Sequence, residues 1–180
     1  KGLLEHGATG IVIGRNEEKI SMLRNSFLEE GFQIKGYPCD VLDEEKLIEV
    51  NEQIIDEFQT IDILVNAAGG HIKEAVQSPE DSIFDIKPKD IKRTVDLNLF
   101  GTVYPTLIFG KTMVTQGTGS VINISSMASE RAVSRVLGYS LAKSGIDSLT
   151  KWLSMEFGRL YGDKVRVNAI APGFFISEQN

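Results

Sequence analysis

Short apolar segments alternate along the chain with longer segments in which apolar residues recur at helical spacing. The short segments are rich in β-branched residues and predict five buried strands, at 9–14, 32–39, 61–65, 120–124 and 164–170. The segments between them are long enough for helical crossovers, which join parallel strands. The pattern therefore predicts an α/β protein with a doubly wound parallel sheet in three αβα layers, formed by a single domain over residues 1–180.

Polar residues and glycines mark several helix ends. Asn16 can cap an amphipathic segment that ends at Gly31, and Asp43 opens the next helix. Residues 138–161 predict one long helix, whereas the polar segment 71–87 predicts a loop or a loose helical excursion.

Residues 90–116 also follow a helical pattern. Gly101 and Pro105 lie within this segment, and both residue types weaken a helix interior. We therefore expect the helix to be interrupted at these two positions.

Both ends of the chain look cut. Residues 1–7 are typical of the last turns of an apolar helix, with Gly7 where a terminal glycine is expected. The chain stops shortly after a turn at Pro172 and Gly173. We therefore expect a fragment of a longer protein that lacks the first and last strands of its sheet.

Composition and charge narrow the class of protein. The 180 residues include 19 Lys and Arg against 25 Asp and Glu, for a formal net charge of -6. Nucleic-acid and anionic-membrane surfaces need the opposite balance. The single cysteine, Cys39, excludes an internal disulfide and a cysteine-based metal cluster. With no apolar run long enough to span a bilayer, the expectation is a cytoplasmic enzyme domain.

Ligands of parallel sheets bind at the carboxyl ends of the strands, and the segment after the fourth predicted strand carries candidate chemistry. Ser126 follows that strand, and Tyr139 lies 13 residues further on. Lys143 is four residues beyond Tyr139, so the two share one helix face. A free tyrosine is too weak an acid to serve as a base at neutral pH, and a neighbouring ammonium favours the phenolate. The serine hydroxyl could hold a substrate oxygen against the phenol.

Three further motifs occur in the order and spacing of one family. They are Asn66-Ala67-Ala68-Gly69, Asn98 within Asp-Leu-Asn-Leu-Phe-Gly, and Asn168-Ala-Ile-Ala-Pro172-Gly173. With Ser126, Tyr139 and Lys143, they make the sequence resemble the single-domain branch of the short-chain dehydrogenases/reductases over nearly all its length. The resemblance implies a Rossmann-type fold, an enzyme, and hydride transfer between a nicotinamide cofactor and a carbon that bears oxygen.

The resemblance implies four catalytic residues. Tyr139 is expected to be the general acid/base, and Lys143 to support it and to bind the nicotinamide ribose. Ser126 is expected to orient the substrate carbonyl, and Asn98 to hold a water that links Lys143 to solvent. No metal is implied.

The resemblance also implies a cofactor site. The expected contacts are Arg15, Asp40, Val41, Asn66, Ala67, Ala68, Gly69, Tyr139, Lys143, Pro172, Gly173 and Ser177. The glycine-rich phosphate loop of the family is absent from the sequence, and we expect it just before Lys1.

Arg15 bears on the choice of cofactor. It follows the first predicted strand, where an NAD-selective site would carry an acidic residue. A guanidinium can pair with a 2′-phosphate, which favours NADP over NAD, although it could also stack on the adenine of either cofactor.

Local strings around these motifs are similar to those of D-mannonate (fructuronate) oxidoreductase-like and sugar-acid or polyol dehydrogenases. Arg131, Arg135, His71 and Lys73 could face a substrate carboxylate, or could be ordinary surface residues. The helices of 90–116 and 138–161 are apolar on more than one side, and in the family they pack against a second subunit, so a homodimer or homotetramer is expected.

Two other functions remain open. A nucleotide-sugar epimerase or dehydratase shares the Tyr-x-x-x-Lys pattern, but such chains are usually longer. A dinucleotide-binding scaffold or sensor without turnover would retain the fold, although the presence of all four expected catalytic residues argues against it.

Overall fold

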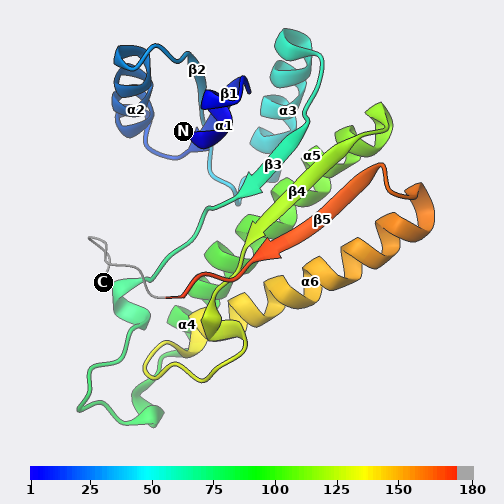
Figure 1. Cartoon of the computed structure of the whole chain (residues 1–180). Coiled ribbons are helices and arrows are strands. Elements are labelled where there is room, and N and C mark those ends of the chain that lie inside the picture. Colours follow the sequence, from blue (N-terminus) through cyan, green and yellow to red (C-terminus); the bar gives the residue numbers. More distant parts are fainter. Residues whose placement is uncertain (174–180) are drawn as a thin grey trace.

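The computed structural model describes residues 1–173. Its strands are β1 (Gly10–Gly14), β2 (Ile34–Pro38), β3 (Ile63–Asn66), β4 (Gly119–Ile124) and β5 (Val165–Ile170). All of their pairings are parallel: β1 pairs with β2, and β4 lies between β3 and β5 (Figure 1). The predicted α/β fold with parallel strands is therefore confirmed.

Within residues 1–173, six α-helices connect and cover these strands. They are α1 (Gly2–Glu5), α2 (Glu17–Glu29), α3 (Glu44–Phe58), α4 (Pro88–Val95), α5 (Gly101–Gln116) and α6 (Leu137–Tyr161). The side chain of Asn16 accepts a hydrogen bond from the backbone N–H of Lys19, and Asp43 accepts one from that of Lys46. Both predicted N-caps are thus confirmed.

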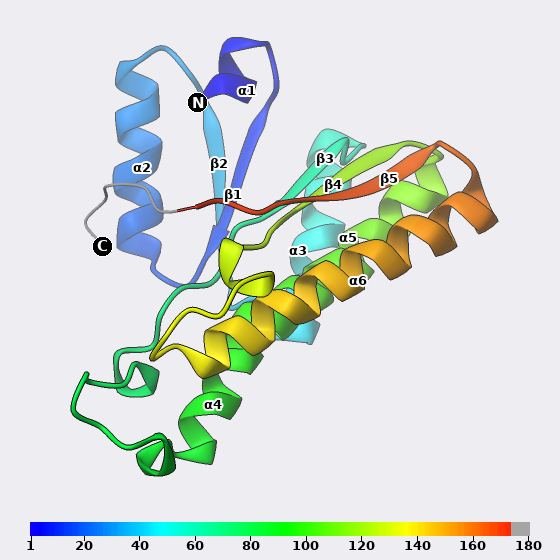
Figure 2. The same ribbon diagram turned by 60° about the horizontal axis from the view of Figure 1, so that its bottom comes forward.

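The helices lie on both faces of the β1–β2 pair. Gly36 of β2 faces Ile20 of α2, because a Cβ built on Gly36 would lie 2.1 Å from Ile20 Cγ2. The next residue, Tyr37, points the other way into a core with Leu47 of α3 and Phe109 of α5. Alternate strand residues point to opposite faces, so α2 forms one layer and α3 with α5 the other (Figure 2).

A second apolar core lies beneath the three-stranded sheet. Val121 of β4 and Val167 of β5 pack there with Met113 of α5 and Leu153 of α6. Between the two sheets, β1 and β3 share no ladder, and the side chains of Ile63 and Val65 on β3 are 42% and 43% exposed. The two sheets are joined by the core that α3 and α5 cover, to which Leu64 of β3 contributes.

The helical segment before β4 departs from the prediction. It is irregular at Asp96–Phe100, which forms a π-turn, and α5 then runs through Gly101 and Pro105 without a break. The wide π-helical turn at Asp96–Phe100 accommodates an extra residue. Pro105, which lies in α5 just beyond this turn, removes one backbone N–H from the helix. The expected interruption is therefore displaced toward Asn98, at the centre of the wide turn.

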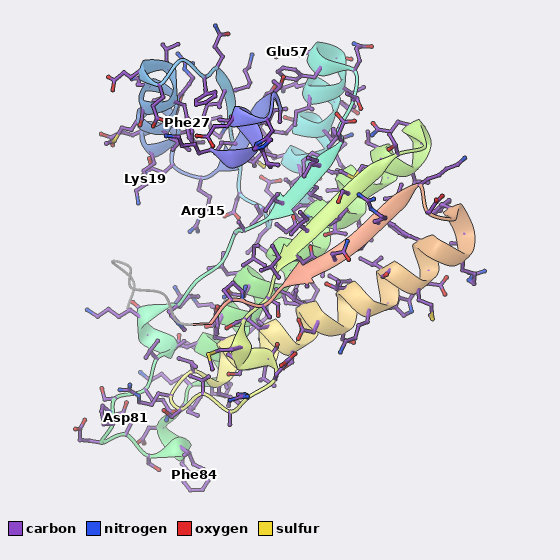
Figure 3. All side chains as sticks on the ribbon, in the orientation of Figure 1. Arg15, Lys19, Phe27, Glu57, Asp81 and Phe84 are labelled. Atoms are coloured by element: carbon purple, nitrogen blue, oxygen red, sulfur yellow. The ribbon has the colours of Figure 1, made fainter. Side chains whose placement is uncertain are left out.

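The polar segment 71–87 forms two short 3₁₀ turns, at Lys73–Ala75 and Ile83–Asp85. Ser82 and Asp85 form a reciprocal capping box in the second turn. This turn presents Phe84 to solvent, with 89% of its surface exposed, at the lower end of the molecule in Figure 3.

Candidate active site

Lys143 is a buried cation at the carboxyl end of β4. It lies on α6, is only 5% exposed, and its Nζ donates a hydrogen bond of 2.6 Å to the carbonyl of Ile124. Burial lowers the pKa of the Lys143 ammonium to about 8, and the carboxylate of Asp147 partly opposes this effect. The site therefore holds an amine whose charged form is costly at neutral pH.

Tyr139 lies one helical turn before Lys143 and is half-buried. The Nζ of Lys143 is 5.4 Å from the centroid of the phenol ring, so the spacing of four residues does bring the two groups together. The ring of His71 also contacts the phenol, with the ring centroids 4.5 Å apart and the planes tilted by 41°. Tyr139 is thus held between a cation from its own helix and an imidazole from the loop after β3.

Two consecutive serines follow β4 and have different surroundings. Ser125 is buried, and its hydroxyl lies 3.4 Å from the carbonyl oxygen of Lys143. Ser126 is half-buried, and its hydroxyl oxygen accepts a hydrogen bond from the N–H of Ala128 at the start of a 3₁₀ turn. The hydroxyl proton of Ser126 is therefore available to a ligand at the edge of the sheet, whereas Ser125 faces the interior.

Asn98 fixes the loop after β3. Its Nδ2 donates to the carbonyls of Gly70, at 3.0 Å, and Thr94, at 2.9 Å, while its Oδ1 accepts from the N–H of Gly70 at 2.8 Å. A Cβ on Gly69, where φ is 149°, would lie 2.6 Å from this Oδ1. The fully buried side chain of Asn98 is therefore committed to the loop. A water held by Asn98, as predicted, would have to use its backbone.

The side chain of Asn66 does not face the expected ligand site. Its Nδ2 donates to Thr106 Oγ1 at 2.7 Å and to Asn123 Oδ1 at 2.9 Å. Asn123 in turn donates to Thr150 Oγ1 at 2.9 Å. This buried polar network joins β3, β4, α5 and α6, so a ligand could contact residue 66 only through the backbone.

Two charged residues lie at the ends of β1 and β2. Arg15 Nη1 is 3.8 Å from Asp40 Oδ2, and the arginine side chain is 68% exposed. Figure 3 labels this side chain. The other carboxylate oxygen of Asp40 accepts a hydrogen bond from the N–H of Leu42. Val41 packs beneath the start of α5, where a Cβ on Gly101 would lie 2.9 Å from Val41 Cγ2.

The segment after β5 reaches the same edge of the sheet. The carbonyl of Pro172 accepts a hydrogen bond of 3.0 Å from the N–H of Met127, next to Ser126. Gly173 is the last residue that the structure describes. The predicted contact Ser177 lies outside the described residues.

Within residues 1–173, the side chains of three basic candidates make no contact that brings them to Tyr139. Lys73, Arg131 and Arg135 are exposed, and their side chains form no hydrogen bond or salt bridge there. Arg135 adopts a left-handed backbone conformation, with φ of 68°, and its carbonyl accepts a hydrogen bond from the N–H of Gln77. The loop before α6 is thus tied to segment 71–87.

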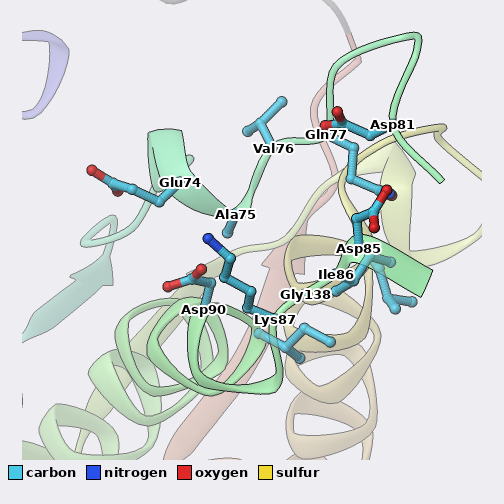
Figure 4. Close-up of a pocket in the computed structure, with 12 residues that line it drawn as sticks. Glu74, Ala75, Val76, Gln77, Asp81, Asp85, Ile86, Lys87, Asp90 and Gly138 are labelled. Carbon is cyan, nitrogen blue, oxygen red and sulfur yellow. The ribbon is translucent and has the colours of Figure 1, made fainter. Parts of the chain in front are cut away.

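A pocket of about 250 Å³ lies between segment 74–91 and the start of α6 (Figure 4). Two of its acidic side chains serve local structure: Asp81 accepts a hydrogen bond from the N–H of Ser78, and Asp85 accepts one from that of Ser82. Within residues 1–173, no three His, Cys, Asp or Glu side chains are grouped closely enough to hold a metal. None of the described helices is long and apolar enough to cross a membrane.

Cys39 is buried in the core beside Tyr37, and burial, followed by nearby carboxylates, raises the pKa of its thiol. The interpretation of Cys39 as a small core residue is confirmed.

The arrangement places a tyrosine, a buried lysine and a serine at the carboxyl edge of a parallel sheet. The family model of the short-chain dehydrogenases matches residues 1–180. The chain belongs to the short-chain dehydrogenase family.

Individual members of the short-chain dehydrogenase family are similar over most of the chain. A 2-dehydro-3-deoxy-D-gluconate 5-dehydrogenase of Formosa agariphila is 33% identical and covers 99% of it. A Haemophilus influenzae structure with bound NAD, provisionally named a D-mannonate oxidoreductase, is 34% identical over 96% of the chain, with a TM-score of 0.87. A gluconate 5-dehydrogenase of Burkholderia cenocepacia, in complex with NADP and tartrate, is 31% identical over 99%, with a TM-score of 0.85. The chain spans 64% to 66% of the length of these relatives.

Sequence reasoning missed the contact between the rings of His71 and Tyr139. It considered His71 only as a possible partner of a carboxylate or as a loop residue. Its place directly after Gly69 and Gly70, at the carboxyl end of β3, was the available signal.

Proposed function

We propose that the full-length protein is an NAD(P)-dependent oxidoreductase that interconverts a ketone and an alcohol on a sugar acid or polyol, such as fructuronate and mannonate. The observation that carries this proposal is the buried Lys143 ammonium 5.4 Å from the ring of Tyr139. Family membership and the names of the sugar-acid relatives support the substrate class.

In the proposed mechanism, Tyr139 gives a proton to the substrate oxygen during reduction and takes it back during oxidation. Lys143 stabilises the phenolate, because its charge is poorly screened in a buried site. Ser126 donates its hydroxyl proton to the same substrate oxygen. Asn98 holds the loop that brings His71 against Tyr139. A bound nicotinamide would supply or accept the hydride.

The described part of the carboxyl edge of the sheet fits a dinucleotide. Nothing lies within 4 Å of a Cβ built on Gly70, so the backbone after β3 is open to a ligand. We propose that Arg15, Asp40 and Val41 contact the adenosine end. The backbone of residues 66–69 would line the adenosine and ribose side of the cofactor. Tyr139 and Lys143 would contact the ribose next to the nicotinamide. Pro172, Gly173 and Ser177 would contact the nicotinamide itself.

The preference for NADP over NAD rests on Arg15. Its exposed guanidinium is available to a 2′-phosphate, and its weak pairing with Asp40 at 3.8 Å would be easily exchanged. Related structures contain NAD in one case and NADP in another, so both cofactors belong in the assay.

We also propose that α5 and α6 pair with a second copy, in a homodimer or homotetramer. These helices expose Leu107, Leu141 and Trp152, each more than half accessible to solvent. Apolar side chains on one face of two adjacent helices are typical of a subunit interface.

The test uses the full-length protein and follows nicotinamide absorbance with fructuronate, with NADPH and NADH in parallel. Tyr139→Phe should lower kcat by about 10²–10⁴-fold and leave the Kd of the cofactor within about twofold. Tyr161→Phe, at the far end of the same helix, is the matched control. Substantial turnover by Tyr139→Phe would refute the acid/base role. Tight cofactor binding with no turnover by the wild type on any ketone would favour the scaffold, and product formed without net cofactor oxidation would favour the epimerase.

A further inference from the structure

His71 lies against the phenol that the proposed reaction uses. The centroid of its ring is 4.5 Å from that of Tyr139. The Lys143 ammonium is near enough to lower the pKa of the imidazole. The preceding residue, Gly70, is held at both its N–H and its carbonyl by the buried side chain of Asn98. The imidazole is therefore placed at the site by a rigid loop.

The imidazole is suited to bind a hydroxyl group. Partial burial, followed by repulsion from Lys143, lowers the pKa of His71 from its ordinary 6.5, so the ring is neutral at neutral pH. A neutral imidazole presents one donor and one acceptor, and a hydroxyl can satisfy both kinds of partner. Within residues 1–173, the His71 ring makes no hydrogen bond, which leaves both nitrogens for a ligand.

We propose that His71 binds substrate and determines specificity: it hydrogen-bonds a hydroxyl on the carbon next to the reacting carbonyl. A substrate whose carbonyl oxygen meets the phenol of Tyr139 brings its neighbouring carbon toward the adjacent imidazole. Polyhydroxy ketones are thereby selected over ketones without hydroxyls. This inference rests on the proposed function, because it requires that the substrate oxygen be bound by Tyr139.

Two substitutions separate hydrogen bonding from ring stacking. His71→Phe keeps an aromatic ring beside Tyr139 and removes both hydrogen-bonding nitrogens. His71→Gln keeps a donor and an acceptor and removes the ring. His6→Leu is the control, because His6 is the other histidine of the chain and lies at the end of α1, where it bonds the carbonyl of Gly2.

The full-length variants are assayed with fructuronate and with cyclohexanone, and the ratio of the two kcat/KM values is compared with that of the wild type. His71→Phe should lower this ratio by about 10–100-fold, as expected for one lost hydrogen bond to a bound substrate. His71→Gln should keep it within about threefold, and His6→Leu should not change it. Cofactor affinity and urea unfolding show that each variant is folded.

The opposite pattern would overturn the inference. If His71→Gln lowers the ratio and His71→Phe does not, the ring itself, and not its nitrogens, distinguishes the two ketones. An equal loss of kcat/KM on both ketones would mean that the ring merely positions Tyr139. If the wild type reduces cyclohexanone but prefers no polyhydroxy ketone, the assignment of His71 fails while the oxidoreductase proposal stands. If the wild type reduces neither ketone with either cofactor, the proposed function fails and the inference fails with it.

Discussion

Replacing Lys143 with methionine should stabilise the protein at neutral pH while it removes the cation beside Tyr139. The pKa of Lys143 is lowered by burial from 10.5 to about 8. The difference between these two values corresponds to about 3 kcal/mol of folding free energy. The hydrogen bond from Nζ to the carbonyl of Ile124 offsets about 1–2 kcal/mol of this cost. We expect the Lys143→Met variant to be more stable by about 1–2 kcal/mol near pH 7.

The pH dependence of this difference isolates the effect of charge. The folded-state pKa of Lys143 lies below the unfolded value, so the unfolded chain binds more protons between about pH 8 and pH 10.5. The stability contributed by this residue therefore rises with pH through that window and is lost as pH falls through about 8. The advantage of the methionine variant should shrink by about 2 kcal/mol between about pH 6.5 and about pH 9.5.

Urea unfolding of the full-length wild type and the Lys143→Met variant at both pH values measures this change. Lys151→Met is the matched control, because Lys151 is an exposed lysine of the same helix. A stability difference that does not vary with pH would refute the assignment of a buried, charge-disfavouring site. So would a methionine variant that is most stable, relative to the wild type, at the higher pH.

Two further pairs of substitutions test the residues that support the site. Gly69→Ala should cost about 2–4 kcal/mol, because its φ is 149° and its new Cβ would displace Asn98 Oδ1. Gly70→Ala, at φ of 141° with open space around it, should cost only about 1–2 kcal/mol, and equal losses in urea unfolding would contradict this reasoning. Asn123→Leu should cost about 2–4 kcal/mol, because it takes away one hydrogen bond from each of two buried side chains. The exposed Asn168→Leu on β5 is its control, and a similar unfolding midpoint for the two variants would argue against a stabilising network.

Local chemistry made much of the fold predictable. Asn16 and Asp43 act as N-caps through bonds to residues only three positions away, so their roles can be read from the sequence around them. The five strands also appear close to where β-branched runs were found, as in Val165–Ile170 for the expected 164–170. Signals of this kind depend on neighbours in the chain.

Contacts between distant residues account for what was missed. Asn98 bonds Gly70, 28 residues away, so its helical surroundings in the sequence gave no sign that its side chain was already used. Asn66 lies in a recognisable motif, yet its partner Asn123 is 57 residues away and turns it toward the interior. In both cases the residue type indicated a polar role and only the fold showed which polar group it meets.

Apolar patterns left a similar ambiguity on the outer helices. A helix that is apolar on several sides predicts burial, but Leu107 of α5 and Trp152 of α6 are 54% and 58% exposed in the single chain. Hydrophobic spacing shows that a surface is suited to burial and does not specify the partner. This is why the subunit contact is a proposal, whereas the inner faces of the same helices are a described core.

The buried polar groups of the site are of two kinds: those whose hydrogen bonds are all made within the protein, and a charged group that is left without full compensation. Asn98 and Asn123 are fully buried, and their donors and acceptors meet partners across several elements, so they make the carboxyl edge of the sheet rigid. Lys143 is also buried, but its short hydrogen bond to a carbonyl does not compensate for the loss of water. In the proposed reaction this cation lies beside Tyr139, so a residue that destabilises the free protein has a use in the chemistry. We therefore expect methionine at position 143 to improve folding and abolish turnover together.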